Sequence, residues 1–102
     1  MKNWQLKEKK DAKFLGGNLH KGSGNRWYRP GDSSNEAYLC ESKYTEKKSY
    51  SINKSKLNKL YEEALFSKKI PLLSIQIQDM DVVVIFKEDF QTLLKNQKKN
   101  QL

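Results

Sequence analysis

Cysteine, histidine and long apolar runs are scarce in this chain, and each scarcity argues against a class of protein. The 102 residues include one cysteine, Cys40, and one histidine, His20. A single cysteine cannot form an internal disulfide, and one residue of each type is too few for an ordinary structural zinc site. The sequence therefore predicts neither a disulfide framework nor a zinc-stabilised fold.

Signals for membrane insertion and secretion are also missing. No stretch of about 18 consecutive apolar residues occurs, which is roughly the length that a helix needs to cross a bilayer. The lysine-rich N-terminus lacks the apolar segment of a signal peptide. We therefore expect a cytoplasmic protein with no membrane partner.

Positive charge is present in excess. The chain carries 20 Lys and Arg against 12 Asp and Glu, a formal net charge of +8. This balance favours a polyanionic partner, and nucleic acid is favoured over a membrane because no apolar anchor accompanies the charge. At this length we expect one domain, residues 1–102, which buries roughly 60–70% of its unfolded surface.

Hydrophobic periodicity predicts an α/β domain, a small mixed central sheet of four or five strands flanked by helices. The predicted elements are helices over residues 3–15, 53–67 and 88–98, strands over residues 32–34, 36–44, 71–77 and 81–86, and a polar, frayed tail over residues 96–102. Gly16 and Gly17 are expected to end the first helix. The last strand is apolar throughout, so we expect cover on both of its faces, with helices over one face and either core or a second subunit over the other. Phe90, Leu93 and Leu94 of the last helix should face inward.

The predicted strand over residues 36–44 carries an acid and a base on one face. Side chains alternate along a strand, so Glu41 and Lys43 project together while Cys40 projects to the opposite face, where a buried apolar role is favoured. The predicted hairpin, turning near Asn35, brings Asp32 beside Glu41. Burying such charges is costly unless they are paired or bind a metal.

This constellation suits metal-assisted phosphodiester hydrolysis. Mg²⁺ prefers oxygen ligands and keeps several waters, so the carboxylates of Asp32 and Glu41 with the main-chain carbonyl of Ser42 suffice to hold it, and Mn²⁺ is expected to substitute. Lys43 would orient or deprotonate the attacking water and stabilise the charge of the transition state. The alternative is an ordinary Glu41–Lys43 ion pair on a solvated strand face, worth about 0–1 kcal/mol.

A segment rich in glycine and positive charge precedes Asp32. Its glycines would let backbone amides approach phosphates, and its basic side chains would bind phosphate oxygens. The candidate DNA-binding residues are His20, Lys21, Arg26, Arg29, Lys47, Lys48 and Lys54. Trp27 and Tyr28 stack on an unpaired base or else cover the sheet, and solvated lysines remain the simpler alternative for the basic residues. We expect Lys54, Lys56 and Lys59 of the helix over residues 53–67 to point away from the sheet.

The order of these motifs resembles that of the Holliday junction resolvases of archaea and their phage relatives, within the PD-(D/E)XK nuclease superfamily. The similar segments, between about Glu8 and Phe86, are Glu8-x3-Ala12-x3-Gly16-Gly17, Gly22-Ser23-Gly24, Pro30-Gly31-Asp32, Glu41-Ser42-Lys43, Lys47-Lys48-Ser49-Tyr50-Ser51-Ile52, Glu63-Ala64 and Lys69-Ile70-Pro71-Leu72-Leu73. Two departures are visible. Gly31 separates Pro30 from Asp32, and Asp11 competes with Glu8 as the N-terminal acid, where the spacing to Ala12 favours Glu8.

The resemblance implies a restriction-endonuclease-like core and a Mg²⁺-dependent endonuclease that cuts branched DNA, with the four-way Holliday junction as first-choice substrate. It implies Glu8, Asp32, Glu41 and Lys43 as catalytic residues and adds Ser23 to the DNA contacts. Two matched cuts in a junction are most simply made by a C2 homodimer. The alternatives are a less selective endonuclease acting on flaps, forks or duplex, and a non-catalytic DNA-binding protein. The short, Lys- and Asn-rich chain favours a phage source, which would place the protein in the host cytoplasm.

Overall fold

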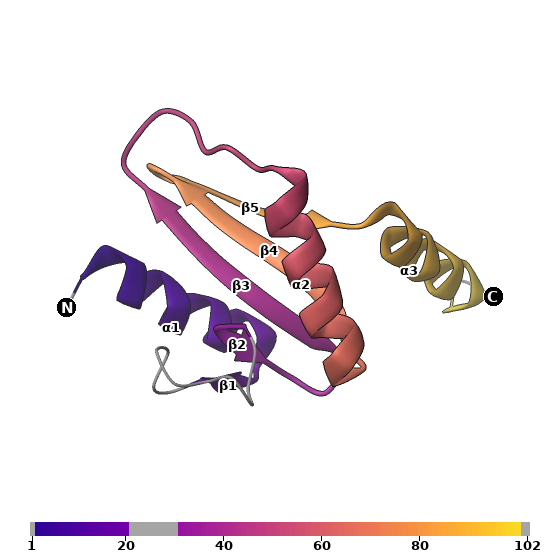
Figure 1. The fold of residues 1–102 in the computed structure, drawn as a ribbon. Coiled ribbons are helices and arrows are strands. Elements are labelled where there is room, and N and C mark those ends of the chain that lie inside the picture. The colour runs from indigo at the N-terminus through magenta and orange to yellow at the C-terminus, as the bar shows by residue number, and fades with distance from the viewer. Residues whose placement is uncertain (1, 21–30, 101–102) are drawn as a thin grey trace.

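Eight helices and strands build the described part of the chain, residues 2–20 and 31–100 of the computed structural model (Figure 1). In chain order they are α1 (Asn3–Leu15), β1 (Asn18–Leu19), β2 (Ser33–Ser34), β3 (Tyr38–Thr45), α2 (Lys54–Ser67), β4 (Ile70–Ile77), β5 (Met80–Ile85) and α3 (Lys87–Asn100). All three predicted helices and all four predicted strands are present, and β1 is an additional short strand. The last helix continues to Asn100, two residues beyond its predicted end.

The strands form one mixed sheet in the order β1-β2-β3-β4-β5. Only the central pair, β3 and β4, is parallel, and the other neighbours are antiparallel. Parallel neighbours need a crossover connection, which α2 supplies between them. The prediction of an α/β domain with a mixed sheet flanked by helices is therefore confirmed at this level.

Helix α1 ends where its sequence predicts. Gly16 adopts a left-handed conformation with φ of 62°, which a residue without Cβ reaches at no steric cost. The amide of Gly16 donates to the carbonyl of Lys13, and the amide of Gly17 donates to that of Ala12. These bonds satisfy carbonyls at the end of the helix and turn the chain into β1.

Helix α2 covers one face of the sheet, and α1 lies against the other (Figure 1). The side chain of Asn53 caps α2 by accepting a hydrogen bond of 2.9 Å from the amide of Lys56. Leu60 then packs with Leu73 and Ile75 of β4 in the apolar core. Residues 41 and 73 are paired across β3 and β4, so the core and Glu41 share the face that α2 covers.

The described chain does not bury the last strand, whose cover by a second subunit stays a prediction, and the prediction that the last helix faces inward is wrong. Val82 is 40% exposed and Val83 44% exposed, because β5 is the edge strand and its two faces receive little cover. Phe90, Leu93 and Leu94 were expected to face inward, yet all three are exposed. The physical reason is that α3 extends beyond the end of β5 and away from the sheet (Figure 1).

Candidate active site

The hairpin between β2 and β3 positions Asp32. Asn35 closes the turn through its side-chain oxygen, which accepts hydrogen bonds from the amides of Ala37 at 2.9 Å and Tyr38 at 2.7 Å. The amide of Asp32 donates to the carbonyl of Cys40 at 2.9 Å. Asp32, which is buried, therefore lies alongside β3, as the predicted hairpin requires.

The carboxylate of Asp32 is bound directly to the backbone of β3. Its Oδ2 accepts a hydrogen bond of 2.8 Å from the amide of Ser42. The amide and carbonyl of one strand residue project from the same edge of the strand, so the carbonyl of Ser42 lies on the side of Asp32. The geometry is compatible with the carboxylate–carbonyl ligand pair predicted from the sequence.

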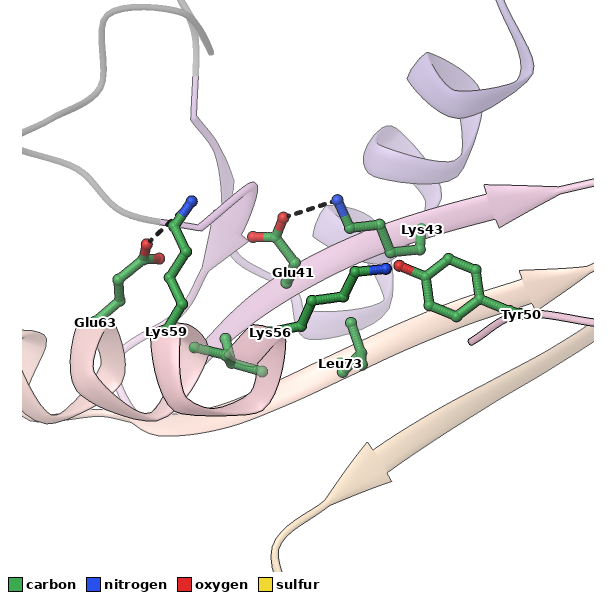
Figure 2. Close-up of a pocket in the computed structure, with 8 residues that line it drawn as sticks. Glu41, Lys43, Tyr50, Lys56, Lys59, Glu63 and Leu73 are labelled. Atoms are coloured by element: carbon green, nitrogen blue, oxygen red, sulfur yellow. Dashed lines mark ion pairs between the residues drawn. The ribbon is translucent and has the colours of Figure 1, made fainter. Parts of the chain in front are cut away.

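Glu41 and Lys43 project from β3 on the face that α2 covers, as strand alternation predicts (Figure 2). The Nζ of Lys43 lies 3.3 Å from the Oε1 of Glu41. The Glu41 side chain is 27% exposed and that of Lys43 is 41% exposed, so water reaches both. Glu41 and Lys43 are therefore partly buried, and both side chains are accessible to a ligand.

Burial and neighbouring charges shift the pKa values of Glu41 and Lys43. The pKa of the Glu41 carboxyl lies above its ordinary value, first because the group is largely buried and second because the Asp32 carboxylate is near; Lys43 opposes both effects without cancelling them. Burial alone would lower the pKa of Lys43, but the attraction of Glu41 outweighs it and the pKa lies above its ordinary value. Lys43 is therefore a stable ammonium ion beside two acids that repel each other.

Helix α2 contributes residues that were not predicted for the site. Lys56, Lys59 and Glu63 line one pocket with Glu41 and Lys43, together with Tyr50, Leu60 and Leu73 (Figure 2). Lys59 and Glu63 are 4.0 Å apart, and the Nζ of Lys56 lies 4.9 Å from the centre of the Tyr50 ring. Lys56 is exposed and the Lys59 side chain is 80% exposed, as expected of side chains that point away from the sheet, but both also line this pocket. Their helical spacing with Glu63 was the available signal, since residues 56, 59 and 63 fall on one flank of a helix.

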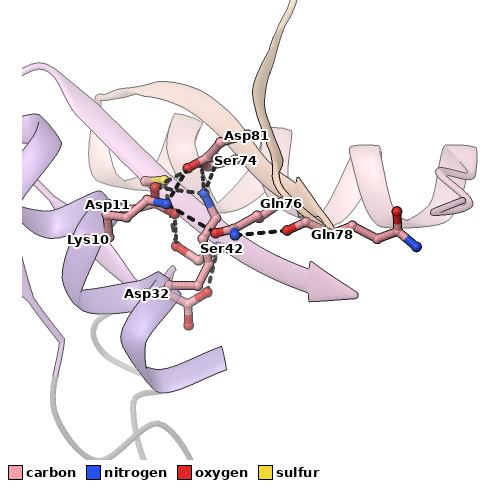
Figure 3. Close-up of polar contacts among 10 residues, drawn as sticks. Lys10, Asp11, Asp32, Ser42, Ser74, Gln76, Gln78 and Asp81 are labelled. Atoms are coloured by element: carbon pink, nitrogen blue, oxygen red, sulfur yellow. Dashed lines mark hydrogen bonds and ion pairs between the residues drawn. The ribbon is translucent and has the colours of Figure 1, made fainter. Parts of the chain in front are cut away.

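The opposite face of β3 holds a buried polar network (Figure 3). The Nζ of Lys7 donates to Asp11 at 2.9 Å, to Ser74 at 2.7 Å and to Asp81 at 2.5 Å. The hydroxyl of Ser42 donates to the second oxygen of Asp11 at 2.6 Å. Ser42 therefore links the two faces, since its amide binds Asp32 and its hydroxyl binds Asp11.

Two acids of α1, Glu8 and Asp11, are the candidates for the N-terminal acid of the site. Glu8 is partly buried on α1, one position after Lys7, while Asp11 faces the polar network. No group of three or more His, Cys, Asp and Glu side chains within residues 2–20 and 31–100 is placed to hold a metal ion together. Neither acid of α1 therefore joins Asp32 and Glu41 in such a group, and the catalytic role of Glu8 stays a prediction.

Cys40 and His20 are both buried. Burial is the main cause that raises the pKa of the Cys40 thiol to about 12, which agrees with a packing role. The His20 ring lies between strands, with Nδ1 3.3 Å from the carbonyl of Gly31 and Nε2 2.8 Å from the hydroxyl of Ser34. His20 thus joins β1 to the segment that carries Asp32, and its contact with DNA stays a prediction.

The remaining candidate DNA-binding residues fall into two groups. Lys21, Ser23, Arg26 and Arg29, with Trp27 and Tyr28, lie outside the described residues. Lys47, Lys48 and Lys54 are exposed in the connection from β3 to α2 and at the start of α2. Lys54 lies in the same first turn of α2 as Lys56, which lines the pocket.

Comparisons with protein families, with curated proteins and with solved structures found no match for this chain. Within residues 2–20 and 31–100, no helix has the length and apolar character needed to span a bilayer. The functional interpretation consequently depends on the geometry of the carboxylates and on the motif resemblance.

Proposed function

We propose that the protein is a metal-dependent endonuclease with a restriction-endonuclease-like core that cuts branched DNA, the Holliday junction first. One observation carries the proposal. Glu41 and Lys43 lie 3.3 Å apart in one pocket, and burial first and the Asp32 carboxylate second raise the pKa of Glu41. A second carboxylate near Glu41 would supply the oxygen ligands that a divalent cation prefers, which supports a metal site.

The residues fit Mg²⁺, with Mn²⁺ as a substitute. Asp32 and Glu41 would supply carboxylate oxygens, and Ser42 its carbonyl, a hard-oxygen set typical of Mg²⁺ sites. When bound, the ion would neutralise charge that develops on the phosphate and activate a water. Asp32 is already fixed by the amide of Ser42 at 2.8 Å, so one ligand is held in place before the ion arrives.

In this proposal Lys43 acts as a positive charge and not as a base. Because its pKa is raised by Glu41, it carries its proton at neutral pH and is poorly suited to remove a proton from water. Its ammonium group would instead orient the attacking water and stabilise the negative charge of the transition state. Of the two roles predicted for Lys43, its charge favours orientation over deprotonation.

The DNA would lie across the pocket and the exposed lysines beside it. Lys56 and Lys59 line the pocket, and Lys47, Lys48 and Lys54 are exposed between β3 and α2 and at the start of α2, so these lysines would supply positive charge to phosphates. Contacts to phosphates position DNA without reading its sequence, which suits an enzyme selective for branch shape. Paired cuts across a symmetric junction would be made by a homodimer.

The test is cleavage of an end-labelled four-way junction and a linear duplex of matched sequence, with Mg²⁺, Mn²⁺ or EDTA. We expect paired, metal-dependent cuts in the junction, and Glu41→Ala should lower their rate on the order of 10²-fold or more. Glu62→Ala, on the exposed side of α2, is the matched control and should cut as wild type does.

The other outcomes are informative. Equal cleavage of duplex and junction would make the protein a less selective endonuclease. Binding without cleavage under any metal would make it a DNA-binding protein with structural carboxylates. If wild type cuts and Glu41→Ala cuts equally well, the site assignment is wrong.

A further inference from the structure

Helix α3 has an apolar stripe that nothing in the described chain covers. Phe90, Leu93 and Leu94 follow the spacing of one helix face, and each is between 38% and 50% exposed. The helix leaves the end of β5 and lies apart from α1 and α2 (Figure 1). Most of the stability of a short helix comes from packing of its apolar face, so we expect another apolar surface to cover this stripe.

Strand β5, which leads directly into α3, has a free edge. In the described sheet it pairs with β4 alone. Exposed edge strands are usually protected by lysine, proline or a bulge, yet β5 contains neither residue type, and its single charge, Asp81, is bound by Lys7 and Lys10 of α1. Val82 and Val83 are exposed at this edge.

Helix α2 extends the same surface. The Tyr61 ring packs edge-on against Phe86, at the junction of β5 and α3, with ring centres 5.5 Å apart and an interplanar angle of 77°. Leu65, one turn after Tyr61 on the same flank, is 66% exposed. This flank lies opposite the one that carries Lys56, Lys59 and Glu63, so the apolar surface and the candidate active site occupy different sides of α2.

We propose that this surface, formed by Val82, Leu65, Phe90, Leu93 and Leu94, is the interface of a symmetric dimer in which α3 packs antiparallel against α3 of a second copy. The area fits such an occupant. From their exposed fractions, these residues present on the order of 450 Å², close to the non-polar part of a standard interface of about 800 Å² per partner.

The charges of α3 also fit a second copy. Glu88 and Asp89 lie in its first turn, and Lys95 and Lys98 lie toward its C-terminal end. A twofold axis through the middle of α3 makes the two helices antiparallel, which places the acidic end of each beside the basic end of the other. Leu93, near the middle of the helix, then lies next to Leu93 of the second copy.

Sedimentation velocity at micromolar concentration, in buffer without DNA or metal, tests the proposal. Wild type should sediment with twice the chain mass of 12.0 kDa. Leu93→Glu should weaken association by about 30-fold or more, because it places an unpaired charge at the centre of the interface. Phe66→Ser is the matched control, since Phe66 is 82% exposed on a different side of α2, and it should leave association unchanged.

Cross-linking supplies a second measurement that does not depend on the fold of the glutamate variant. Leu93→Cys should form an intermolecular disulfide under mild oxidation, whereas Phe66→Cys should not. The native Cys40 is buried and does not compete. Wild type that sediments as a single chain, or a dimer that Leu93→Glu leaves intact, would overturn the proposal.

The inference rests on the homodimer of the proposed function and names its surface, and it is measured without substrate. A monomer that still cuts junctions would leave metal-dependent cleavage standing and remove the homodimer together with its interface. A dimer that cuts no DNA under any metal would do the reverse. The two proposals can therefore fail separately.

Discussion

The two faces of β3 differ in the burial and pairing of their charged side chains. Beneath α1, Lys7 is almost fully buried, with its Nζ hydrogen-bonded to Asp11, Ser74 and Asp81. Beneath α2, Glu41 has one cation within ion-pair distance, Lys43 at 3.3 Å, and a second carboxylate nearby. The first face is a buried hydrogen-bonded network, and the second is a partly exposed pocket in which Lys43 lies beside Glu41.

The difference separates stability from function. Charges in a buried network lose much of their stabilising effect when one member is removed, because the others stay buried without a partner. Acids that repel each other add nothing to the fold, and their persistence is expected where a ligand uses them. Substitutions on the two faces should therefore change the free energy of unfolding by different amounts, with the largest change on the face beneath α1.

Removal of Lys7 should have the largest effect on stability. Lys7→Ala leaves Asp11 buried without its cation and is expected to lower the free energy of unfolding by about 3–5 kcal/mol. Lys10→Ala is the matched control, because Lys10 also pairs with Asp81, at 3.1 Å, but its side chain is 57% exposed, so a loss of about 0–1 kcal/mol is expected. Urea unfolding measures both, and equal losses would remove the contrast between a buried and a surface cation.

Ser42→Ala should have an intermediate effect, because it cuts the side-chain link between the faces. The variant loses the hydrogen bond of 2.6 Å to Asp11 and keeps the amide that binds Asp32. Leaving a buried carboxylate oxygen without its donor costs about 1–3 kcal/mol. Ser55→Ala on the exposed face of α2 should stay within about 0.5 kcal/mol of wild type. If Ser42→Ala unfolds at the wild-type urea concentration, the hydroxyl does not tie the faces together.

Glu41→Gln should have the smallest effect, within about 1 kcal/mol, since it removes both an ion pair and a repulsion. The sign depends on pH. A carboxyl whose pKa is raised by folding destabilises the native state once the pH exceeds its unfolded value, and this cost disappears as the pH falls through the raised value. The variant should therefore gain stability relative to wild type as the pH rises from acid to neutral. A gain that grows toward acid instead would mean that Glu41 is stabilised as a carboxylate.

Asp81 gives the contrasting sign on the other face. Burial alone would raise its pKa, but hydrogen bonds from Lys7 and Lys10 outweigh burial and lower it. The stability that Asp81 contributes is therefore present above its unfolded pKa and is lost as the pH falls through the lowered value. Acid thus weakens the network beneath α1 while it relieves the repulsion beneath α2.

Much of the framework could be predicted from the sequence because it depends on local periodicity. Strand alternation places Glu41 and Lys43 on one face and Cys40 on the other, and the turn at Asn35 brings Asp32 alongside, as the hydrogen bonds show. The helix ends at Gly16 and Asn53 follow from capping chemistry. Each of these features is decided within a few residues of chain.

Other features depend on which helices and strands pack together. The spacing of apolar residues along the sequence does not predict that packing. The run from Lys7 to Lys10 resembles a solvated face, yet Lys7 is buried because Ser74 and Asp81, more than 60 residues away, come to meet it. The stripe of Phe90, Leu93 and Leu94 predicts a helix with an apolar face but not what covers it. Lys56 and Lys59 line the pocket of Glu41 because of the rotation of α2 over the sheet, which tertiary packing sets.

The parallel pairing of β3 with β4 sets an order of assembly. Tyr38 pairs with Ile70 and Thr45 with Ile77, so the chain must close a loop of about 30 residues before this central pair forms. Asp32 reaches Ser42 across ten residues and a tight turn. Loop closure is faster for near neighbours, so local contacts favour early pairing of Asp32 with β3, and the apolar core follows from slower, distant contacts.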